Sequence, residues 1–108
     1  MRFFALFFAL LFAVSAAGPP DRNPAAPQSP DVQAGEKLFR EHCAQCHGAL
    51  AQGTGRAPAL RTAFIHNASP DFLMGVLKNG ILRRGMPSWS SLPEPMRRQI
   101  VAYLKQLE

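Results

Sequence analysis

A short cysteine and histidine motif carries the clearest chemistry in this sequence. Residues 43–47 read CAQCH, and the pattern C-x-x-C-H is the attachment sequence of c-type haem. Two thiols one helical turn apart can reach the two vinyl groups on one side of a porphyrin, and the next residue can then ligate the iron. The spacing therefore predicts one covalently bound haem c, with Cys43 and Cys46 forming the thioethers and His47 as the proximal iron ligand.

Two other uses of this motif fit the sequence less well. A structural zinc site needs four ligands in a tetrahedral set, so Cys43, Cys46 and His47 would need help from His66 or a carboxylate. A thiol redox site needs a βαβ context, and the sequence shows no alternating strand pattern. There is also no carboxylate pair, no nucleophile with a base and no Gly-rich phosphate loop, so the sequence indicates no second chemistry.

Three segments with helical signals would position this motif, namely residues 31–43, 70–79 and 92–107. Asp31 and Ser69 can cap the first two helices, and Gly80 can end the second. Ser91 and Glu94 form a capping box for the third. The intervening chain contains Gly and Pro and is expected to form two loops, at residues 48–69 and 81–90. An all-α fold is therefore predicted.

The N-terminal residues 1–17 have the features of a secretory signal. Arg2 supplies a short positive region, residues 3–14 are an unbroken apolar run, and small residues follow. Cleavage after Ala16 or Ala17 fits this pattern. The alternative is a retained membrane anchor, but the run is shorter than the roughly 20 residues of a spanning helix. We therefore expect a periplasmic protein, with membrane contact only if the leader is not cleaved.

A Pro-rich stretch separates this leader from the part that folds. Residues 18–30 hold five of the ten prolines and are expected to form a flexible linker without chemistry. Residues 31–108 remain for the folded domain. A domain this small is marginal without a disulfide, a metal or a cofactor, so a covalent haem would supply apolar mass that the chain lacks.

With its helices and motif, the chain resembles the small single-haem cytochrome c family (class I) over about residues 32–107. In that family a Gly and an aromatic residue of the N-terminal helix cross an apolar and an aromatic residue of the C-terminal helix. Gly35 and Phe39 match the first pair, and Ile100 and Tyr103 match the second. The resemblance implies a cytochrome c-like fold of three main helices and long loops wrapped around one haem.

The resemblance also implies a sixth ligand to the iron. In the family this ligand is a Met in a loop before the last helix, usually followed by Pro, and Met86 with Pro87 matches that pattern. Met74 and Met96 compete for the role, but both fall within predicted helices, where a Met more often fills the core. His66 in the 48–69 loop is a weaker candidate. Met86 is therefore expected to be the distal iron ligand.

Two further residues acquire roles by the same resemblance. The carbonyl of Pro58 is expected to accept the N–H of His47 and so orient its ring, although a simple turn proline is the alternative. Trp89 is expected to pack near a haem edge and hydrogen-bond a propionate, or else to be a core aromatic residue. His42 and His66 are expected to be solvated.

A His/Met ligand set fills both axial positions, so the resemblance implies an electron carrier rather than an enzyme. The expected donors are a dehydrogenase or a quinol-oxidising complex, and the expected acceptors are an oxidase or a reductase. One alternative is the cytochrome subunit of a periplasmic dehydrogenase complex. A haem sensor or peroxidase is a further alternative, and it would need a labile sixth site.

The net charge of +5 does not indicate a nucleic-acid-binding protein. Loss of Arg2 with the leader lowers this charge, and the two propionates of a haem lower it again. Arg83 and Arg84 lie just before Met86, in the loop expected near the haem edge. They are predicted to steer acidic redox partners, because complementary charge raises encounter rates. The alternative is a pair of charges that is merely solvated.

Overall fold

The computed structural model describes residues 29–108, which form helices joined by loops, with no strand among them. The predicted leader and all but the end of the predicted linker lie outside the described residues. The helices are α1 (Pro30–His42), α2 (Ala44–His47), α3 (Ala63–Asn67), α4 (Pro70–Asn79), the 3₁₀ helix η2 (Leu82–Arg84) and α5 (Glu94–Leu104). The prediction of an all-α fold is confirmed. No helix in this part of the chain has the length and apolarity needed to cross a membrane.

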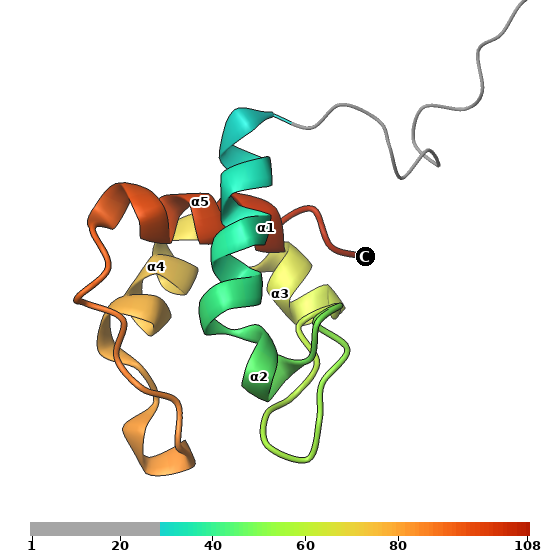
Figure 1. Ribbon diagram of the computed structural model, residues 1–108. Coiled ribbons are helices and arrows are strands. Elements are labelled where there is room, and N and C mark those ends of the chain that lie inside the picture. The colour runs from blue at the N-terminus through green and yellow to red at the C-terminus, as the bar shows by residue number, and fades with distance from the viewer. Residues whose placement is uncertain (1–28) are drawn as a thin grey trace, which may run out of the picture.

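The crossing of α1 and α5 forms the centre of the fold (Figure 1). A Cβ atom on Gly35 would lie 1.8 Å from the backbone oxygen of Gln99, so only glycine lets the two helices approach this closely. Phe39, one turn after Gly35 on α1, and Ile100, next to Gln99 on α5, are fully buried, and the rings of Phe39 and Tyr103 lie 5.5 Å apart. The predicted contact between these two pairs of residues is confirmed.

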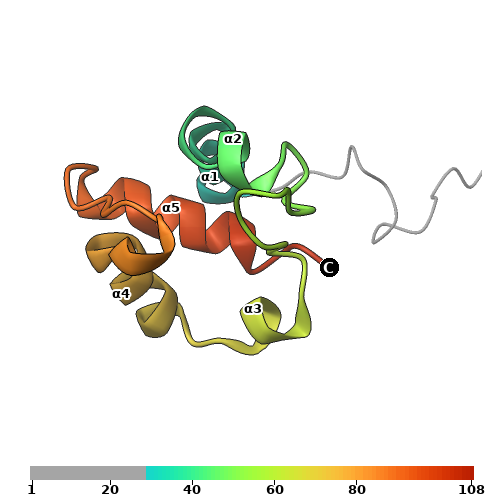
Figure 2. The same cartoon turned by 90° about the horizontal axis from the view of Figure 1, so that it is seen from below.

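α5 lies between α1 on one side and α4 on the other (Figure 2). α4 contributes Leu73 and Leu77 to the core, at the spacing of four residues that one helix face provides. The core therefore continues from the crossing toward α4. Its buried members are Val32, Phe39, Ala51, Leu73, Leu77, Ile100, Val101, Tyr103, Leu104 and Leu107.

The first helix begins one residue earlier than predicted and has a different cap. The side chain of Ser29 accepts a hydrogen bond of 3.2 Å from the backbone N–H of Val32. Pro30 occupies the first turn, where its missing N–H costs nothing. Asp31 is therefore not the cap, although its charge favours the first turn. Ser29 and Pro30 belong to the start of the helix rather than to the linker.

The last helix is shorter than the predicted 92–107, and its predicted capping box is wrong. Pro93 is the N-cap and offers no side-chain hydrogen bond. Glu94 follows directly, too early to serve as the third residue of a capping box. Its carboxylate instead accepts a hydrogen bond of 2.6 Å from Arg98, and this contact lowers the pKa of Glu94.

A short helix, α3, lies within the predicted 48–69 loop. Thr62 caps its start by accepting a hydrogen bond from the backbone N–H of Ile65. At its other end the ammonium group of Lys105 donates to the carbonyls of His66 and Ala68. A helix of five residues is too short to show apolar periodicity, and one of its two caps comes from α5, so the local sequence does not reveal it.

Candidate functional site

The two cysteines lie at a break between two helices. Cys43 ends α1, where its backbone N–H donates to the carbonyl of Phe39 over 2.8 Å. α2 begins at the next residue, and the N–H groups of Cys46 and His47 both donate to the carbonyl of Cys43. This turn sets the two thiols one helical turn apart. Both thiols are free and half-buried, as attachment to a porphyrin requires.

The environment of these thiols argues against the other two uses of the motif. Burial, and then the neighbouring thiol of Cys46, raise the pKa of Cys43 to about 11. A thiol redox site depends on a lowered pKa, because the thiolate is the reacting species. Among residues 29–108 no three His, Cys, Asp or Glu side chains gather closely enough to hold a metal ion. The described residues therefore do not build the four-ligand set of structural zinc.

The ring of His47 is held by a backbone carbonyl. Its Nδ1 atom lies 2.8 Å from the carbonyl oxygen of Pro58. A carbonyl oxygen only accepts, so Nδ1 carries the proton, and in the neutral imidazole Nε2 then presents a lone pair. This is the arrangement of a metal-ligating histidine whose second nitrogen is fixed by an acceptor. The contact is the one that the resemblance implies for Pro58.

The loop that carries Pro58 is tied to the CAQCH motif. The N–H of Gly53 donates to the carbonyl of His47 over 2.7 Å, and the hydroxyl of Thr54 donates to the carbonyl of Cys46 over 2.5 Å. Gly53 has a φ of 90°, and a Cβ there would lie 2.6 Å from the nitrogen of Ala59. Thr54 was not predicted from the sequence, since its only local signal is its place between two glycines.

Met86 lies in a tight hairpin rather than in an open loop. It forms an antiparallel bridge with Ile81, with two backbone hydrogen bonds of 3.0 and 3.2 Å. Gly85 turns the chain with a φ of 91°. A Cβ on Gly80 would lie 2.7 Å from the oxygen of Met86, so Gly80 is needed for this close approach. The side chain of Met86 is half-buried against the core.

The competing methionines are placed as the sequence predicted, within helices. Met74 lies in α4 and packs against the core, and Met96 lies in α5 with 40% of its surface exposed. His66 is exposed on α3, in agreement with the prediction that it is solvated. Of the candidates for a distal ligand, only Met86 lies outside a helix.

Trp89 brings the Met86 loop (residues 81–90) against the attachment segment (residues 42–47). Its ring lies 5.3 Å from the ring of His42, between centroids, at 56°. Its backbone N–H donates to the carbonyl of Leu77 over 2.8 Å. The prediction that His42 is solvated is wrong, because this residue is half-buried against Trp89. The structure thus brings the Met86 loop against the residue that directly precedes the CAQCH motif.

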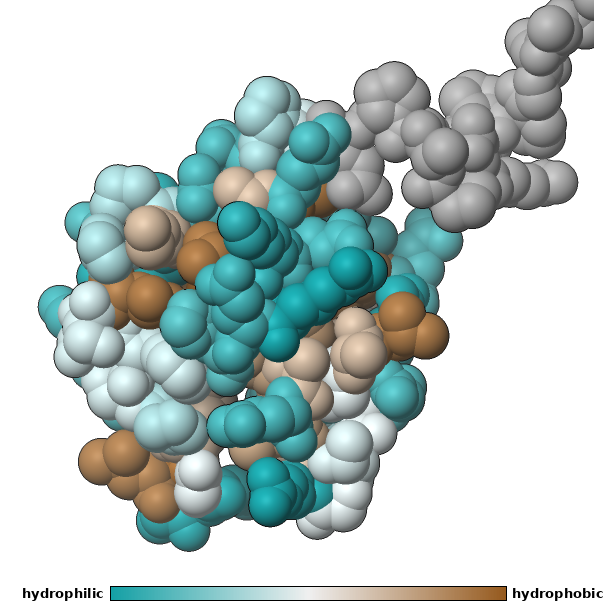
Figure 3. Space-filling model, in the orientation of Figure 1, coloured by the Kyte–Doolittle hydropathy of each residue, from teal (hydrophilic) through white to brown (hydrophobic). Residues whose placement is uncertain are grey.

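Several large apolar side chains remain exposed around these loops. Leu82 is 71% exposed, and Phe64 and Phe72 are 67% and 51% exposed, with their rings 6.0 Å apart. Figure 3 shows apolar surface at the end of the molecule where η2 lies in Figure 1. Exposed apolar surface of this kind is what a prosthetic group or a partner covers.

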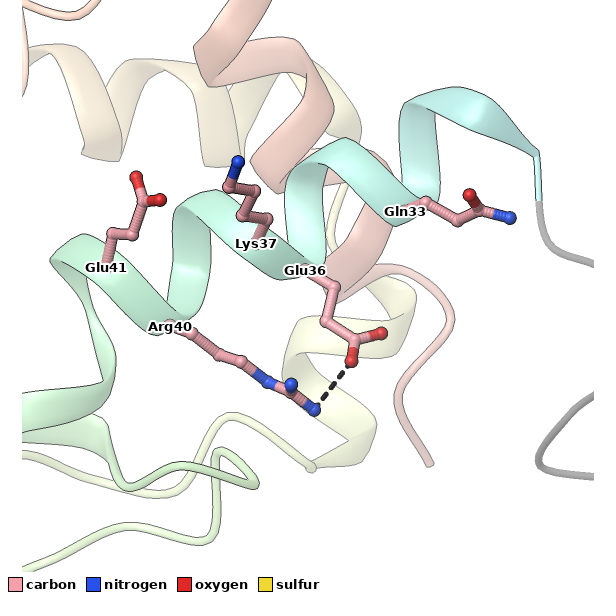
Figure 4. Close-up of a pocket in the computed structure, with 5 residues that line it drawn as sticks. All are labelled: Gln33, Glu36, Lys37, Arg40 and Glu41. Carbon is pink, nitrogen blue, oxygen red and sulfur yellow. Dashed lines mark ion pairs between the residues drawn. The ribbon is translucent and has the colours of Figure 1, made fainter.

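A surface hollow on α1 is separate from this site (Figure 4). It is lined by one polar and four charged side chains of a single helix, and Arg40 and Glu36 form an ion pair of 2.7 Å within it. A hollow lined by charged side chains of one helix is a poor site for a porphyrin. Its lining residues are Gln33, Glu36, Lys37, Arg40 and Glu41.

Comparison with known protein families identifies the family of this chain. Residues 30–104 match the family model described as cytochrome c oxidase, cbb3-type, subunit III. The chain belongs to this family of c-type cytochrome domains. It is therefore a class I c-type cytochrome that binds haem c covalently, with its iron, and takes part in haem-based electron transfer with redox protein partners. A search among curated proteins finds no match to this cytochrome domain.

The side chains of the site fit a covalently bound haem. The two free thiols sit one turn apart, and the His47 ring has its Nδ1 proton engaged by the Pro58 carbonyl. The remaining nitrogen is thus prepared to ligate a metal. This donor set of two thiols and one fixed imidazole is the chemistry that the cofactor requires.

Proposed function

We propose that this cytochrome is an exported, periplasmic electron carrier with His/Met ligation of its haem iron. The observation that carries the proposal is the hydrogen bond from His47 to Pro58, directly beside the two free thiols. When bound, the haem supplies an iron that accepts and returns one electron. The chain's own residues would hold that iron with the same ligands in both oxidation states. This keeps the reorganisation energy of electron transfer small.

Each site residue has a distinct part in this proposal. Cys43 and Cys46 hold the haem through thioethers, and His47 ligates the iron through Nε2. Pro58 fixes the orientation of the His47 ring through its carbonyl. Met86 would ligate the iron with its thioether sulfur, a ligand that raises the potential. A protein with both axial positions filled offers no open site to O₂ or substrate, so electron transfer without catalysis is the proposed activity.

The proposed location rests on the leader and on the family. Residues 1–17 have a positive residue, an apolar run and a small-residue cleavage site. c-type cytochrome domains are typically exported, in agreement with that pattern. A dehydrogenase or a quinol-oxidising complex is the proposed donor, and an oxidase or a reductase is the proposed acceptor.

A second candidate function is that of a subunit within a larger oxidoreductase complex. The matching family model is described by the name of an oxidase subunit, and that description favours an oxidase assembly over the dehydrogenase complex considered from the sequence. Purification of the full chain from its native membrane and soluble fractions distinguishes the two candidates. A free carrier elutes alone, whereas a subunit elutes with larger chains.

Replacing Met86 tests the proposed ligation. We expect the oxidised wild-type protein to show the weak far-red absorption band of a methionine–iron bond, and the reduced protein to resist CO. The Met86→Ala variant should lose the band and bind CO readily. Its potential should fall by a part of the roughly 0.8 V over which axial ligands set haem potentials. Absorption spectra and a spectroelectrochemical titration measure these changes.

Met74→Ala and Met96→Ala are the matched controls, since they remove the same side chain from helices. Both variants should keep the far-red band and a potential close to that of the wild type. A wild-type protein without the band that binds CO readily would contradict the carrier and favour a sensor or peroxidase. Loss of the band in Met74→Ala or Met96→Ala alone would reassign the distal ligand.

Neutralising Arg83 and Arg84 is predicted to slow electron transfer with anionic partners. Both side chains are exposed in η2, and neither forms an ion pair with any residue of the described range. With ferricyanide as the anionic oxidant, the Arg83→Gln/Arg84→Gln variant should react up to about tenfold more slowly at low ionic strength. The difference should vanish at high salt, where charges are screened. Stopped-flow kinetics measure both rates.

The Arg40→Gln/Arg98→Gln variant controls for net charge in this experiment. These arginines are also exposed, but they lie on α1 and α5 and pair with Glu36 and Glu94. We expect this variant to react at nearly the wild-type rate. Equal rates and equal salt dependence for both double variants and the wild type would show that Arg83 and Arg84 are merely solvated.

A further inference from the structure

His42 and Trp89 form a contact that the proposed electron-transfer chemistry does not yet use. Their ring centroids lie 5.3 Å apart at 56°, and both side chains are half-buried. His42 is the last residue of α1 and directly precedes Cys43, whereas Trp89 lies three residues after Met86. Of the ring contacts among residues 29–108, this one joins the Met86 loop to the attachment segment.

The backbone of the Met86 loop is anchored mainly to α4 and to itself. Trp89 donates its N–H to the carbonyl of Leu77, and the Ser88 hydroxyl donates to the carbonyl of Lys78 over 2.5 Å. Met86 is bridged to Ile81 within the same loop. These bonds shape the loop but do not tie it to the segment that carries the haem. The Trp89 ring makes that connection by packing on His42.

A methionine sulfur is a neutral, weak donor, so its ligation depends on how firmly the protein holds the loop that presents it. We propose that His42 is a positioning residue that holds the Met86 loop in place through its contact with Trp89. This inference rests on the proposed ligation of iron by Met86. A contact between two rings also fixes the orientation of one ring relative to the other, because aromatic pairs favour offset or tilted arrangements.

Packing, rather than charge, accounts for the position of the His42 ring. The nearest carboxylate oxygen of Glu41 lies 3.8 Å from Nε2 of His42, which is beyond hydrogen-bond distance. Glu41 is also the adjacent residue and is largely exposed, so it does not restrain the ring. An aromatic side chain without charge should therefore replace His42 in this role.

Binding of imidazole to the ferric protein tests the inference, because imidazole must displace Met86 to reach the iron. The protein used carries covalent haem, verified by mass. At fixed pH, His42→Ala should bind imidazole about twofold to tenfold more tightly than the wild type, the range expected for loss of one aromatic contact. His42→Phe should bind close to the wild-type affinity. His66→Ala, which removes an exposed histidine from α3, should also leave the affinity unchanged.

A urea titration followed by far-UV circular dichroism separates positioning from a merely structural role. An affinity in His42→Ala equal to that in His66→Ala would overturn the inference, even if His42→Ala lowers the urea midpoint. The inference would also be overturned if His42→Phe bound imidazole as tightly as His42→Ala does. Trp89→Leu should raise the affinity as His42→Ala does, and the double variant should add nothing further.

The proposed function and the inference can fail separately in this experiment. A wild-type protein without the far-red band, whose imidazole affinity is unchanged in Met86→Ala, would refute the ligation by Met86 and with it the inference. A wild-type protein that shows the band, but whose imidazole affinity does not respond to His42→Ala, would refute the inference alone.

Discussion

Gly35→Ala is expected to destabilise the folded haem protein by about 3 kcal/mol or more, the upper end of the cost of overpacking. The new Cβ would lie 1.8 Å from the backbone oxygen of Gln99 and 2.5 Å from its carbonyl carbon. These atoms belong to the backbone of α5, so no side-chain rotation relieves the overlap. The two helices must move apart, and the buried contacts of Phe39 with Tyr103 then weaken. Urea unfolding of the haem-containing protein measures the loss.

Gly75→Ala is the matched control for this experiment. Gly75 lies in the middle of α4, and a Cβ there would meet no atom within 4 Å. The same substitution should therefore stabilise the protein by about 0.5–1 kcal/mol, because alanine loses less entropy in a helix than glycine does. Equal unfolding midpoints for Gly35→Ala and the wild type would contradict the close crossing of α1 and α5.

Replacing both cysteines is expected to abolish the covalent attachment of haem and most of the folded state. The Cys43→Ala/Cys46→Ala variant, made in a host that attaches haem, should show no added haem mass after denaturation. A folded part of this size rarely supplies enough core by itself, and large side chains such as Phe64 and Leu82 are already exposed. The variant should therefore lose most of its helical circular dichroism signal.

The single variants Cys43→Ala and Cys46→Ala separate attachment from folding. Each keeps one thiol and should retain haem through one thioether, with a lower yield and a lower urea midpoint. Haem mass on the double variant would show attachment elsewhere in the chain. A double variant that unfolds at the wild-type midpoint would show that the fold does not depend on its cofactor.

Local patterns in the sequence were sufficient to predict a covalent haem and the three main helices. The CAQCH motif specifies its chemistry within a single turn, since its spacing alone sets where the thiols lie. Ser69 and Gly80 act as the predicted caps of α4, because capping depends on a few neighbouring residues. The crossing of Gly35 with α5 was predicted by resemblance, and the close packing in the structure gives its physical reason.

Two of the errors share one cause, which is a partner distant in sequence. α3 was missed because Lys105, from the end of α5, caps its last carbonyls. His42 was placed in solvent because Trp89, in a loop after α4, covers it. The capping box at Glu94 failed for a local reason, because two neighbouring prolines place the start of α5 at Glu94 and Arg98, one turn later, binds the carboxylate.

The sequence by itself determined that this protein carries one covalent haem in an all-α domain, because both conclusions depend on short-range spacing. Only the tertiary structure decided how the side chains of His47 and Met86 are held. The carbonyl that fixes His47 comes from Pro58, eleven residues away, and the ring that joins the Met86 loop to the attachment segment packs on His42. The first contact was expected only through the family resemblance and the second was not expected, because both depend on loops whose conformations follow from the packed core.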